Sequence, residues 1–135
     1  MHVSELMTRE VASVTETTPS AEVVALLAAH RITAMPVVDA GGLLVGVVTE
    51  ADVLRVAIPE DEPRGSTERA LPATVAGLMR RFPITVAPDC DLAIAADLMT
   101  CTAIKSLPVV QGGRVVGMVS RSDLIRGLAR GHPGP

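Results

Sequence analysis

The stretch Met35-Pro-Val-Val-Asp-Ala-Gly-Gly-Leu-Leu-Val-Gly-Val-Val-Thr-Glu-Ala-Asp-Val-Leu-Arg55 decides the fold, because the chain uses it twice. The second copy is Leu107-Pro-Val-Val-Gln-Gly-Gly-Arg-Val-Val-Gly-Met-Val-Ser-Arg-Ser-Asp-Leu-Ile-Arg126, with one residue fewer in its turn. In each copy two apolar runs flank a double glycine, which predicts a β-hairpin. The residues after the second run predict the start of a helix. An internal repeat of this kind guides the interpretation of the whole chain.

Both copies continue the repeat upstream of the hairpin. Val3–Met7 and Val75–Met79 each have apolar residues at the spacing of one helical turn, and Val11–Val14 and Pro83–Val86 are short extended pieces. Each copy is therefore expected to be a β-α-β-β-α repeat with a short leading helix. About 55 residues give only a marginal core. The sequence predicts an α/β fold in which two repeats, related by a pseudo-twofold axis, share one core.

The helix between the extended piece and the hairpin is defined best in the first copy. Thr18 is a good N-cap and Pro19 suits the first helical position, so the helix is expected to open there. Ser20–His30 is rich in Ala, Leu and Val, which predicts a helix that is largely buried. In the second copy the acids Asp89 and Asp91 precede the helix, which runs from about Leu92 to Cys101, and favour its N-terminus.

These elements divide the chain into four parts. We expect the first repeat at residues 1–58 and the second at 73–130. The intervening residues 59–72 are mostly polar and charged with Pro and Gly, which predicts an exposed linker loop. Residues 131–135, Gly-His-Pro-Gly-Pro, are expected to be a disordered tail.

The composition excludes several classes of function. The chain has 135 residues, is 48% hydrophobic, and carries a net charge of −3 with scattered basic residues and a single aromatic residue, Phe82. Without a basic patch or stacking aromatics, nucleic-acid binding is disfavoured. No apolar run approaches the ~20 residues that span a bilayer, and no leader peptide is recognised. We expect a cytoplasmic protein with no membrane partner, which buries part of its apolar surface between subunits.

The sequence shows no catalytic constellation. No nucleophile stands near a base, and the three histidines are isolated. Cys90 and Cys101 have no neighbouring histidine, so they are expected to be inert, buried cytoplasmic thiols rather than metal ligands. We therefore expect no enzymatic activity, no metal and no required cofactor. A metal-responsive or redox role for the two cysteines is the least favoured alternative.

The motifs Thr49-Glu-Ala-Asp52 and Ser120-Arg-Ser-Asp123 have two compatible interpretations. Ser/Thr followed three residues later by an acid is a capping box at a helix N-terminus. The same carboxylate, in the first helical turn, is suited to accept hydrogen bonds from a ribose diol, and the free amides beside it suit a phosphate. The presence of the motif in both copies, after a glycine-bearing strand, favours a binding role in addition to capping.

The pattern Ile32-Thr-Ala-Met-Pro-Val-Val, Gly41-Gly42 and Gly46-Val-Val-Thr-x-x-Asp52, with its second copy, resembles the cystathionine-β-synthase (CBS) domain. Two in tandem resemble the CBS pair called a Bateman module, over almost the whole chain. The resemblance implies a stand-alone regulatory protein that binds AMP, ADP, ATP or S-adenosylmethionine in clefts between the repeats. It also implies a homodimer of two modules and an unidentified regulated protein as partner.

The resemblance also implies the site residues, with the strand entry of one repeat facing the Asp motif of the other. In the family the Asp holds the ribose, while the strand entries and first strands line the adenine pocket. One cleft is expected to comprise Ala12, Ile32, Thr33, Ala34, Ser120, Arg121, Ser122 and Asp123. The other is expected to comprise Ile84, Ile104, Lys105, Ser106, Thr49 and Asp52.

The two expected clefts differ in charge. Arg121 belongs to the first cleft, whereas Glu50 takes the matching place in the second, which Lys105 supplies with one cation. Because a phosphate needs cations or amides, Arg121 favours a charged nucleotide in the first cleft, unless it is only a solvated cation at a helix start. Arg55 and Arg126 either form weak salt bridges with the Asp one turn earlier or bind phosphate.

Two hypotheses of different classes remain open from the sequence. The first is a sensor of adenosine ligands that signals to a partner protein by a conformational or oligomeric change. The second is a CBS pair that binds no ligand and serves dimerisation or docking to another protein. Nucleotide binding by the purified protein distinguishes the two.

Overall fold

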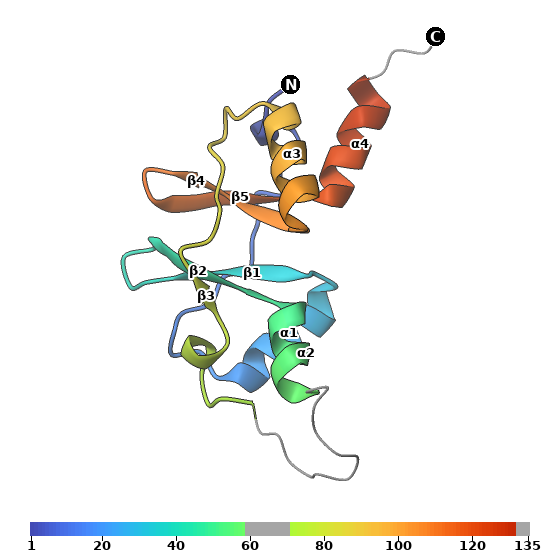
Figure 1. The fold of residues 1–135 in the computed structure, drawn as a ribbon. Helices are drawn as coiled ribbons and strands as arrows, with labels where there is room; N and C mark the ends of the chain where they lie inside the picture. Colours follow the sequence, from blue (N-terminus) through green and yellow to red (C-terminus); the bar gives the residue numbers. More distant parts are fainter. Residues whose placement is uncertain (59–70, 132–135) are drawn as a thin grey trace. The chain divides into compact units, whose positions relative to one another are not determined.

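The computed structural model describes residues 1–58 and 71–131. The linker residues 59–70 and the tail residues 132–135 lie outside the described residues, so the predicted loop and disordered tail are not tested there. The elements follow the predicted order of turn, helix, hairpin and helix in both copies (Figure 1). Their bounds are η1 Val3–Glu5, α1 Ser20–His30, β1 Ala34–Val38, β2 Leu44–Thr49, α2 Glu50–Ala57, η2 Val75–Gly77, β3 Arg80–Arg81, α3 Leu92–Thr102, β4 Ser106–Gln111, β5 Arg114–Ser120 and α4 Arg121–Gly131.

The chain forms two compact units, each with a core of its own where a single shared core was expected, and their borders differ from those of the sequence repeats. The first unit is Ala12–Pro83, and the second combines Met1–Val11 with Ile84–Pro135. The first unit therefore contains η2 from the second repeat, and the second unit contains η1 from the first repeat. The apolar spacing of the two leading turns did not predict this exchange.

The first unit is built on a three-stranded antiparallel sheet of order β1-β2-β3. β1 and β2 form the predicted hairpin, with Ala34 opposite Thr49, and the short β3 extends it by pairing Val47 with Arg80. Helices α1 and α2 pack together within this unit. The core is aliphatic, because the sheet and the helices meet over nine buried side chains: Val14, Val23, Leu27, Met35, Val37, Val48, Val53, Val75 and Leu78.

The second unit repeats this plan around the antiparallel pair β4-β5. Thr8 takes the place of β3 and exchanges two main-chain hydrogen bonds with Met118 of β5, at 2.8 and 2.9 Å. Helices α3 and α4 pack together here. The core again consists of aliphatic residues and methionines: Val3, Met7, Val86, Ala95, Met99, Leu107, Val109, Val119 and Leu124.

The exchanged leading turns are tied in by main-chain bonds as well as by burial. The Val3 amide donates to the Cys90 carbonyl at 2.9 Å, and the Val75 amide donates to the Thr18 carbonyl at 2.9 Å. Both valine side chains are completely buried, in the second and first units respectively. Each turn therefore completes the core of the unit that holds the other copy's hairpin.

The glycine pairs form the hairpin turns that the sequence predicts. Gly42, Gly112 and Gly113 have φ of 85°, 60° and 79°, which is the left-handed region that glycine enters without strain. In the first turn the carboxylate of Asp39 also accepts the amides of Gly41 and Leu43, both at 2.9 Å. The second turn has Gln111 at the corresponding point of the sequence.

Helix α1 corrects two expectations. Pro19, not Thr18, occupies the N-cap position, and the Thr18 hydroxyl instead accepts the Thr15 amide at 3.0 Å. Only Ser20, Val23 and Leu27 of this helix are buried, so it is not largely buried within the chain. The alanines of α1 and Val24 face solvent because only one side of the helix packs against the core.

The predicted extended pieces contribute single bridges rather than strands. Val14 forms a parallel bridge with Val37, and Val86 forms the matching bridge with Val109. Helix α3 begins as expected, because the carboxylate of its N-cap residue Asp91 accepts the Ala93 amide at 2.9 Å.

Candidate ligand-binding site

Asp52 lies in the first turn of α2 and forms the capping box that the sequence predicts. Its Oδ2 accepts the Thr49 amide at 3.0 Å, and its own amide donates to the Thr49 hydroxyl at 3.1 Å. The residue is 1% exposed. A buried carboxylate must be paired or hydrogen-bonded to stay charged, and these bonds fix its orientation at the end of β2.

Asp123 repeats this geometry at the start of α4. Its Oδ2 accepts the Ser120 amide at 2.8 Å, and its amide donates to the Ser120 hydroxyl at 3.2 Å. It is 3% exposed. Capping is therefore confirmed for both motifs, and each unit presents one oriented carboxylate beside a helix N-terminus. We call Thr49 with Asp52 the first half-site, and Ser120 with Asp123 the second half-site.

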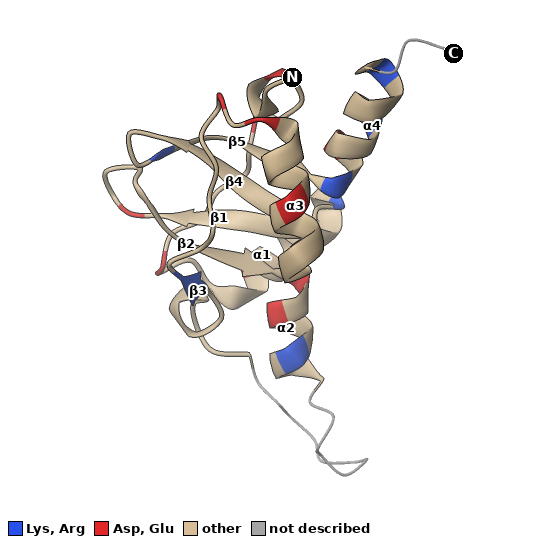
Figure 2. Ribbon diagram, turned by 45° about the horizontal axis from the view of Figure 1, so that its top comes forward, with Lys and Arg blue, Asp and Glu red and all other residues tan. Residues whose placement is uncertain are grey.

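Arginines hold the outer oxygen of each carboxylate. In the first half-site Arg55 Nη1 lies 3.4 Å and Arg80 Nε 2.9 Å from Asp52 Oδ1, and in the second half-site Arg126 bonds Asp123 Oδ1. Figure 2 shows the acidic first turn of α2 in red and the basic residues of α2 and β3 in blue. The predicted Asp-to-Arg contacts within each helix are thus present. The guanidiniums are 58–63% exposed, so each can turn towards another partner when a ligand supplies the carboxylate with new hydrogen bonds.

Arg80 is a member of the first half-site that the sequence analysis missed. It lies 28 positions from Asp52 along the chain, so no spacing rule connects them. Alignment of the two copies places it opposite Thr8, and this difference in charge was the available signal. Only the pairing of β3 with β2 brings the guanidinium to the carboxylate.

The strand entries lie beside the Asp helix of their own copy. The Glu50 amide donates to the Thr33 carbonyl at 2.9 Å, and the Arg121 amide donates to the Lys105 carbonyl at 3.1 Å. These bonds bring each strand entry to the N-terminus of the helix that carries the carboxylate. The expected pairing of each strand entry with the Asp motif of the other copy stays a prediction.

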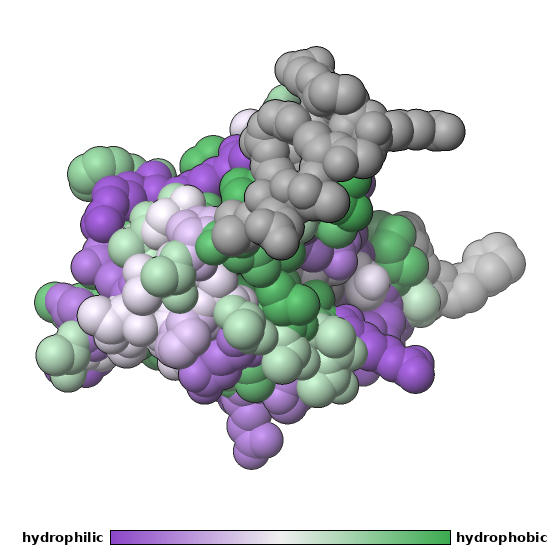
Figure 3. Space-filling model, turned by 90° about the horizontal axis from the view of Figure 1, so that it is seen from below, coloured by the Kyte–Doolittle hydropathy of each residue, from purple (hydrophilic) through white to green (hydrophobic). Residues whose placement is uncertain are grey.

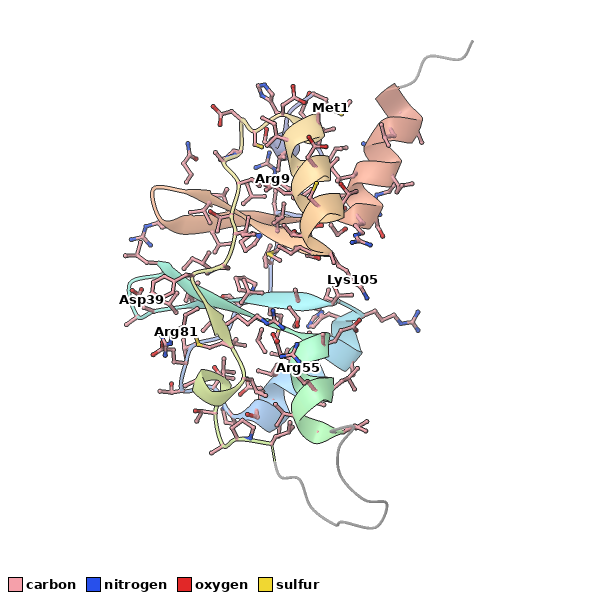
Figure 4. The ribbon with its side chains drawn as sticks, viewed as in Figure 1. Met1, Arg9, Asp39, Arg55, Arg81 and Lys105 are labelled. Atoms are coloured by element: carbon pink, nitrogen blue, oxygen red, sulfur yellow. The ribbon has the colours of Figure 1, made fainter. Side chains whose placement is uncertain are left out.

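The other predicted site residues are divided between the two units. Ala12 and Ile32 are half-buried against the first core, and Ile104 packs against the second core. Ile84 is 41% exposed. Among the remainder, Ala34 begins β1 and Ser106 begins β4, whereas Ser122 and Lys105 are exposed, the latter labelled in Figure 4.

Arg121 has a structural partner that neither interpretation of the sequence foresaw. Its Nε lies 3.3 Å from the Ile104 carbonyl oxygen and its Nη2 lies 3.2 Å from the Met99 carbonyl oxygen. Basic side chains often bond the last carbonyls of a helix, and Met99 lies in the last turn of α3. The guanidinium that was expected to bind phosphate thus donates a hydrogen bond to a main-chain carbonyl at the C-terminus of α3.

The cysteines are not buried as expected, since Cys101 is exposed and Cys90 is half-buried. Burial raises the pKa of the Cys90 thiol, and the charges of Asp91 and Asp89 raise it further. A raised pKa leaves less thiolate, which is the nucleophilic and metal-binding form. Within residues 1–58 and 71–131, His, Cys, Asp and Glu side chains form no group of three that could hold a metal ion. The same residues contain no helix of the length and apolarity that a membrane crossing requires.

Comparison with known proteins assigns a family. The model of the CBS domain matches residues 3–59 and again residues 75–130. A CBS domain-containing protein of Dictyostelium discoideum is 33% identical over 129 residues, which cover 91% of this chain and 88% of that protein. A mitochondrial CBS domain-containing protein of Arabidopsis thaliana, CBSX3, is 32% identical over 105 residues, which cover 76% of this chain and 49% of that protein.

Solved structures agree with this match. The structure of CBSX2 in complex with AMP has a TM-score of 0.86 at 26% identity and covers 98% of this chain and 99% of its own. The CBS domain pair of protein MJ0100, in complex with 5′-methylthioadenosine and S-adenosyl-L-methionine, has a TM-score of 0.82 at 25% identity, covering 98% of both chains. The chain therefore belongs to the CBS domain family, as a tandem CBS pair.

Proposed function

We propose that this protein is a regulatory module that binds an adenosine-containing ligand, AMP, ADP, ATP or S-adenosylmethionine, and signals the bound state to a partner protein. The observation that carries the proposal is the duplicated half-site, a buried and oriented carboxylate at a helix N-terminus in each CBS copy. Related CBS pairs have been solved with AMP and with S-adenosyl-L-methionine.

The chemistry of the half-site suits the ribose of such a ligand. A carboxylate is an acceptor only, and its two oxygens are spaced to receive the two hydroxyl donors of a ribose diol. The arginine that bonds the outer oxygen is 58% exposed in both half-sites, so it can turn away and leave that oxygen to the ligand. The aliphatic strand entries supply apolar faces for an adenine ring.

Binding is expected to signal only to the extent that the ligand prefers one conformation of the module. Neither motif provides a nucleophile with its base, so regulation rather than catalysis is the role we assign. The regulated protein is not identified, and a cytoplasmic location stays a prediction.

The first prediction concerns Asp123. Asp123→Ala and Asp123→Asn are expected to weaken binding of AMP or S-adenosylmethionine at the second half-site by about tenfold or more, because charge-assisted hydrogen bonds to the ribose contribute roughly 1.5–3 kcal/mol. Isothermal titration calorimetry measures this loss. Asparagine retains an oxygen for the Ser120 amide, so Asp123→Asn is the matched variant that keeps the helix cap.

A thermal melt without ligand separates loss of binding from loss of folding. The sequence has no Trp or Tyr, so adenine that copurifies with the protein should dominate its ultraviolet absorbance. Wild-type protein that neither copurifies with an adenine compound nor binds any of the four ligands would contradict the proposal. The second function, a CBS pair that only dimerises or docks, would then remain.

The exposed apolar faces of α2 and α4 support a homodimer as part of the same proposal. Leu54 of α2 and Ile58, the C-cap residue that follows α2, are 54% and 70% exposed, and Ile125 and Leu128 of α4 are 65% and 55% exposed. In Figure 3, a view from below, green apolar side chains reach the surface among purple polar ones. Water-exposed apolar patches on helices mark interaction surfaces, and Leu54 and Ile125 occupy the same place in the two copies. A second copy of the chain is the partner we propose for these faces.

The second prediction tests this surface. Leu54→Glu combined with Ile125→Glu is expected to convert a dimer into a monomer, because two carboxylates per chain would be buried without partners. Analytical ultracentrifugation measures the change. Leu43→Glu is the control, since Leu43 is also exposed, at 42%, but lies at the hairpin and not on either helix. A wild-type protein that is monomeric at high concentration would refute the dimer.

A further inference from the structure

The carboxylate of Asp52 is covered by two cations that face solvent. Its side chain is 2% exposed, whereas those of Arg80 and Arg55 are 63% and 58% exposed. Arg80 Nε lies 2.9 Å and Arg55 Nη1 lies 3.4 Å from the same oxygen, Oδ1. Two guanidiniums and one carboxylate leave the first half-site with one net positive charge from these three groups. Figure 4 labels Arg55, which reaches this carboxylate from the next turn of α2.

The second half-site lacks a counterpart of Arg80. Thr8 pairs with Met118 of β5 as Arg80 pairs with Val47 of β2, so Thr8 stands where Arg80 stands. Threonine carries no charge, and Asp123 with Arg126 is a neutral pair. The two half-sites thus share the capping box and the helical arginine. They differ in the cation on the neighbouring strand, which only the first half-site has, and in the first helical residue, which is Glu50 in the first and Arg121 in the second.

We propose that Arg80 makes the first half-site selective for phosphorylated nucleosides, while the second half-site accepts nucleosides whether or not they carry a phosphate. The inference rests on the proposed function and adds to it the class of ligand that each half-site takes. The sequence suggested Arg121, beside Asp123 of the second half-site, as a residue that binds phosphate. Its guanidinium is bonded to main-chain carbonyls instead.

The physical reason is an exchange of partners on Arg80. A ribose diol that binds Asp52 competes with Arg80 for Oδ1, and a neutral nucleoside offers the displaced guanidinium nothing in return. A nucleotide brings a phosphate, which forms strong, often bidentate, bonds with arginine. Because the Asp52 carboxylate is buried, its pair with Arg80 is costly to break unless both groups find new partners. The phosphate therefore gives Arg80 a new partner at the moment when the ribose takes the carboxylate.

The experiment isolates each half-site with an Asp→Asn substitution in the other. In Asp123→Asn protein, calorimetry with AMP and with adenosine reports on the first half-site. AMP is expected to bind at least about tenfold more tightly than adenosine there, since a charge-assisted bond to the phosphate is at stake. Arg80→Thr, which copies the residue of the second half-site, is expected to remove most of this preference. Arg80→Gln repeats the test with the length of the side chain retained, should Arg80→Thr fail to fold.

Arg81→Thr is the matched control. It removes the same charge from the adjacent residue of β3, but Arg81 bonds Glu16 at 2.6 Å rather than Asp52. The preference for AMP should survive this change. In the converse experiment, in Asp52→Asn protein, Thr8→Arg is expected to raise the preference of the second half-site for AMP over adenosine.

The outcomes separate the two proposals. Equal affinities for AMP and adenosine in the Asp123→Asn protein would overturn the role of Arg80 and leave the adenosine-binding function standing. An equal loss of preference in Arg80→Thr and Arg81→Thr would also overturn it, because general charge rather than contact with Asp52 would then be responsible. Failure of every adenosine compound to bind the wild-type protein would overturn both.

Discussion

Gly46→Ala is expected to destabilise the first unit by about 2–4 kcal/mol, an overpacking cost to which the weakening of the β2-β3 pairing adds. A Cβ at this position would lie 2.7 Å from the carbonyl oxygen of Arg80 and would also collide with the Met79 side chain. The methionine tip can move, but the Arg80 carbonyl belongs to β3, so β3 must shift. Urea unfolding followed by circular dichroism measures the loss.

Gly41→Ala is the control for this prediction. Gly41 lies in the hairpin of the same unit, its added Cβ would approach Asp39 Oδ1 at an ordinary 3.4 Å, and its φ is not positive. We expect its effect to stay within about 0.5 kcal/mol, as for most surface substitutions. Gly117, the counterpart of Gly46, should behave like Gly46, since its Cβ would lie 2.8 Å from the Thr8 carbonyl oxygen. Equal stability of Gly46→Ala and Gly41→Ala would contradict the prediction, because it would show that β3 can shift without a loss of stability.

Val3→Ala should destabilise the unit that contains the second hairpin, although Val3 belongs to the first repeat. Its side chain is completely buried with Leu107, Val109 and Val119 in the second core. Removing two methyl groups costs roughly 1.6 kcal/mol in transfer free energy, and the cavity adds to this, for a total of about 2–3 kcal/mol. Hydrogen exchange measured by mass spectrometry should therefore rise in β4 and β5 and not in β1 and β2.

Val75→Ala provides the reciprocal experiment. Val75 is completely buried in the first core, so its truncation should raise exchange in β1 and β2. Val24→Ala, on the exposed side of α1, should leave both patterns close to those of the wild type. If Val3→Ala raised hydrogen exchange in β1 and β2 instead, the assignment of each leading turn to the unit of the other copy would be refuted.

The hairpins, the starts of α2, α3 and α4, and the family were predictable because local signals specify them. The double glycines fix the turns through positive φ, and the capping boxes at Thr49 and Ser120 fix the starts of α2 and α4. Both kinds of signal act over a few residues, where spacing alone determines which groups meet. The duplicated pattern then identified the CBS pair, and the family match confirms it.

The features that the sequence did not reveal depend on contacts between distant segments. Arg80 reaches Asp52 only through a strand pairing, and a two-residue strand such as β3 has no pattern of its own. The leading turns carry the same apolar spacing whichever core they enter, so the sequence cannot say that Val3 joins the second unit. The burial of α1 was overestimated because alanines count as apolar in the pattern and yet lie readily in solvent.

The exchanged turns also decide how this chain can be taken apart. Residues 12–83 form an insertion within a unit whose two pieces are separated along the chain, and the chain enters and leaves that insertion at Val11 and Ile84. A fragment cut between the repeats would contain one hairpin core without the leading turn that completes it. It would also contain the leading turn that belongs to the core of the other fragment. A fragment of residues 12–83 would keep its own core complete, and its complement would need residue 11 spliced to residue 84.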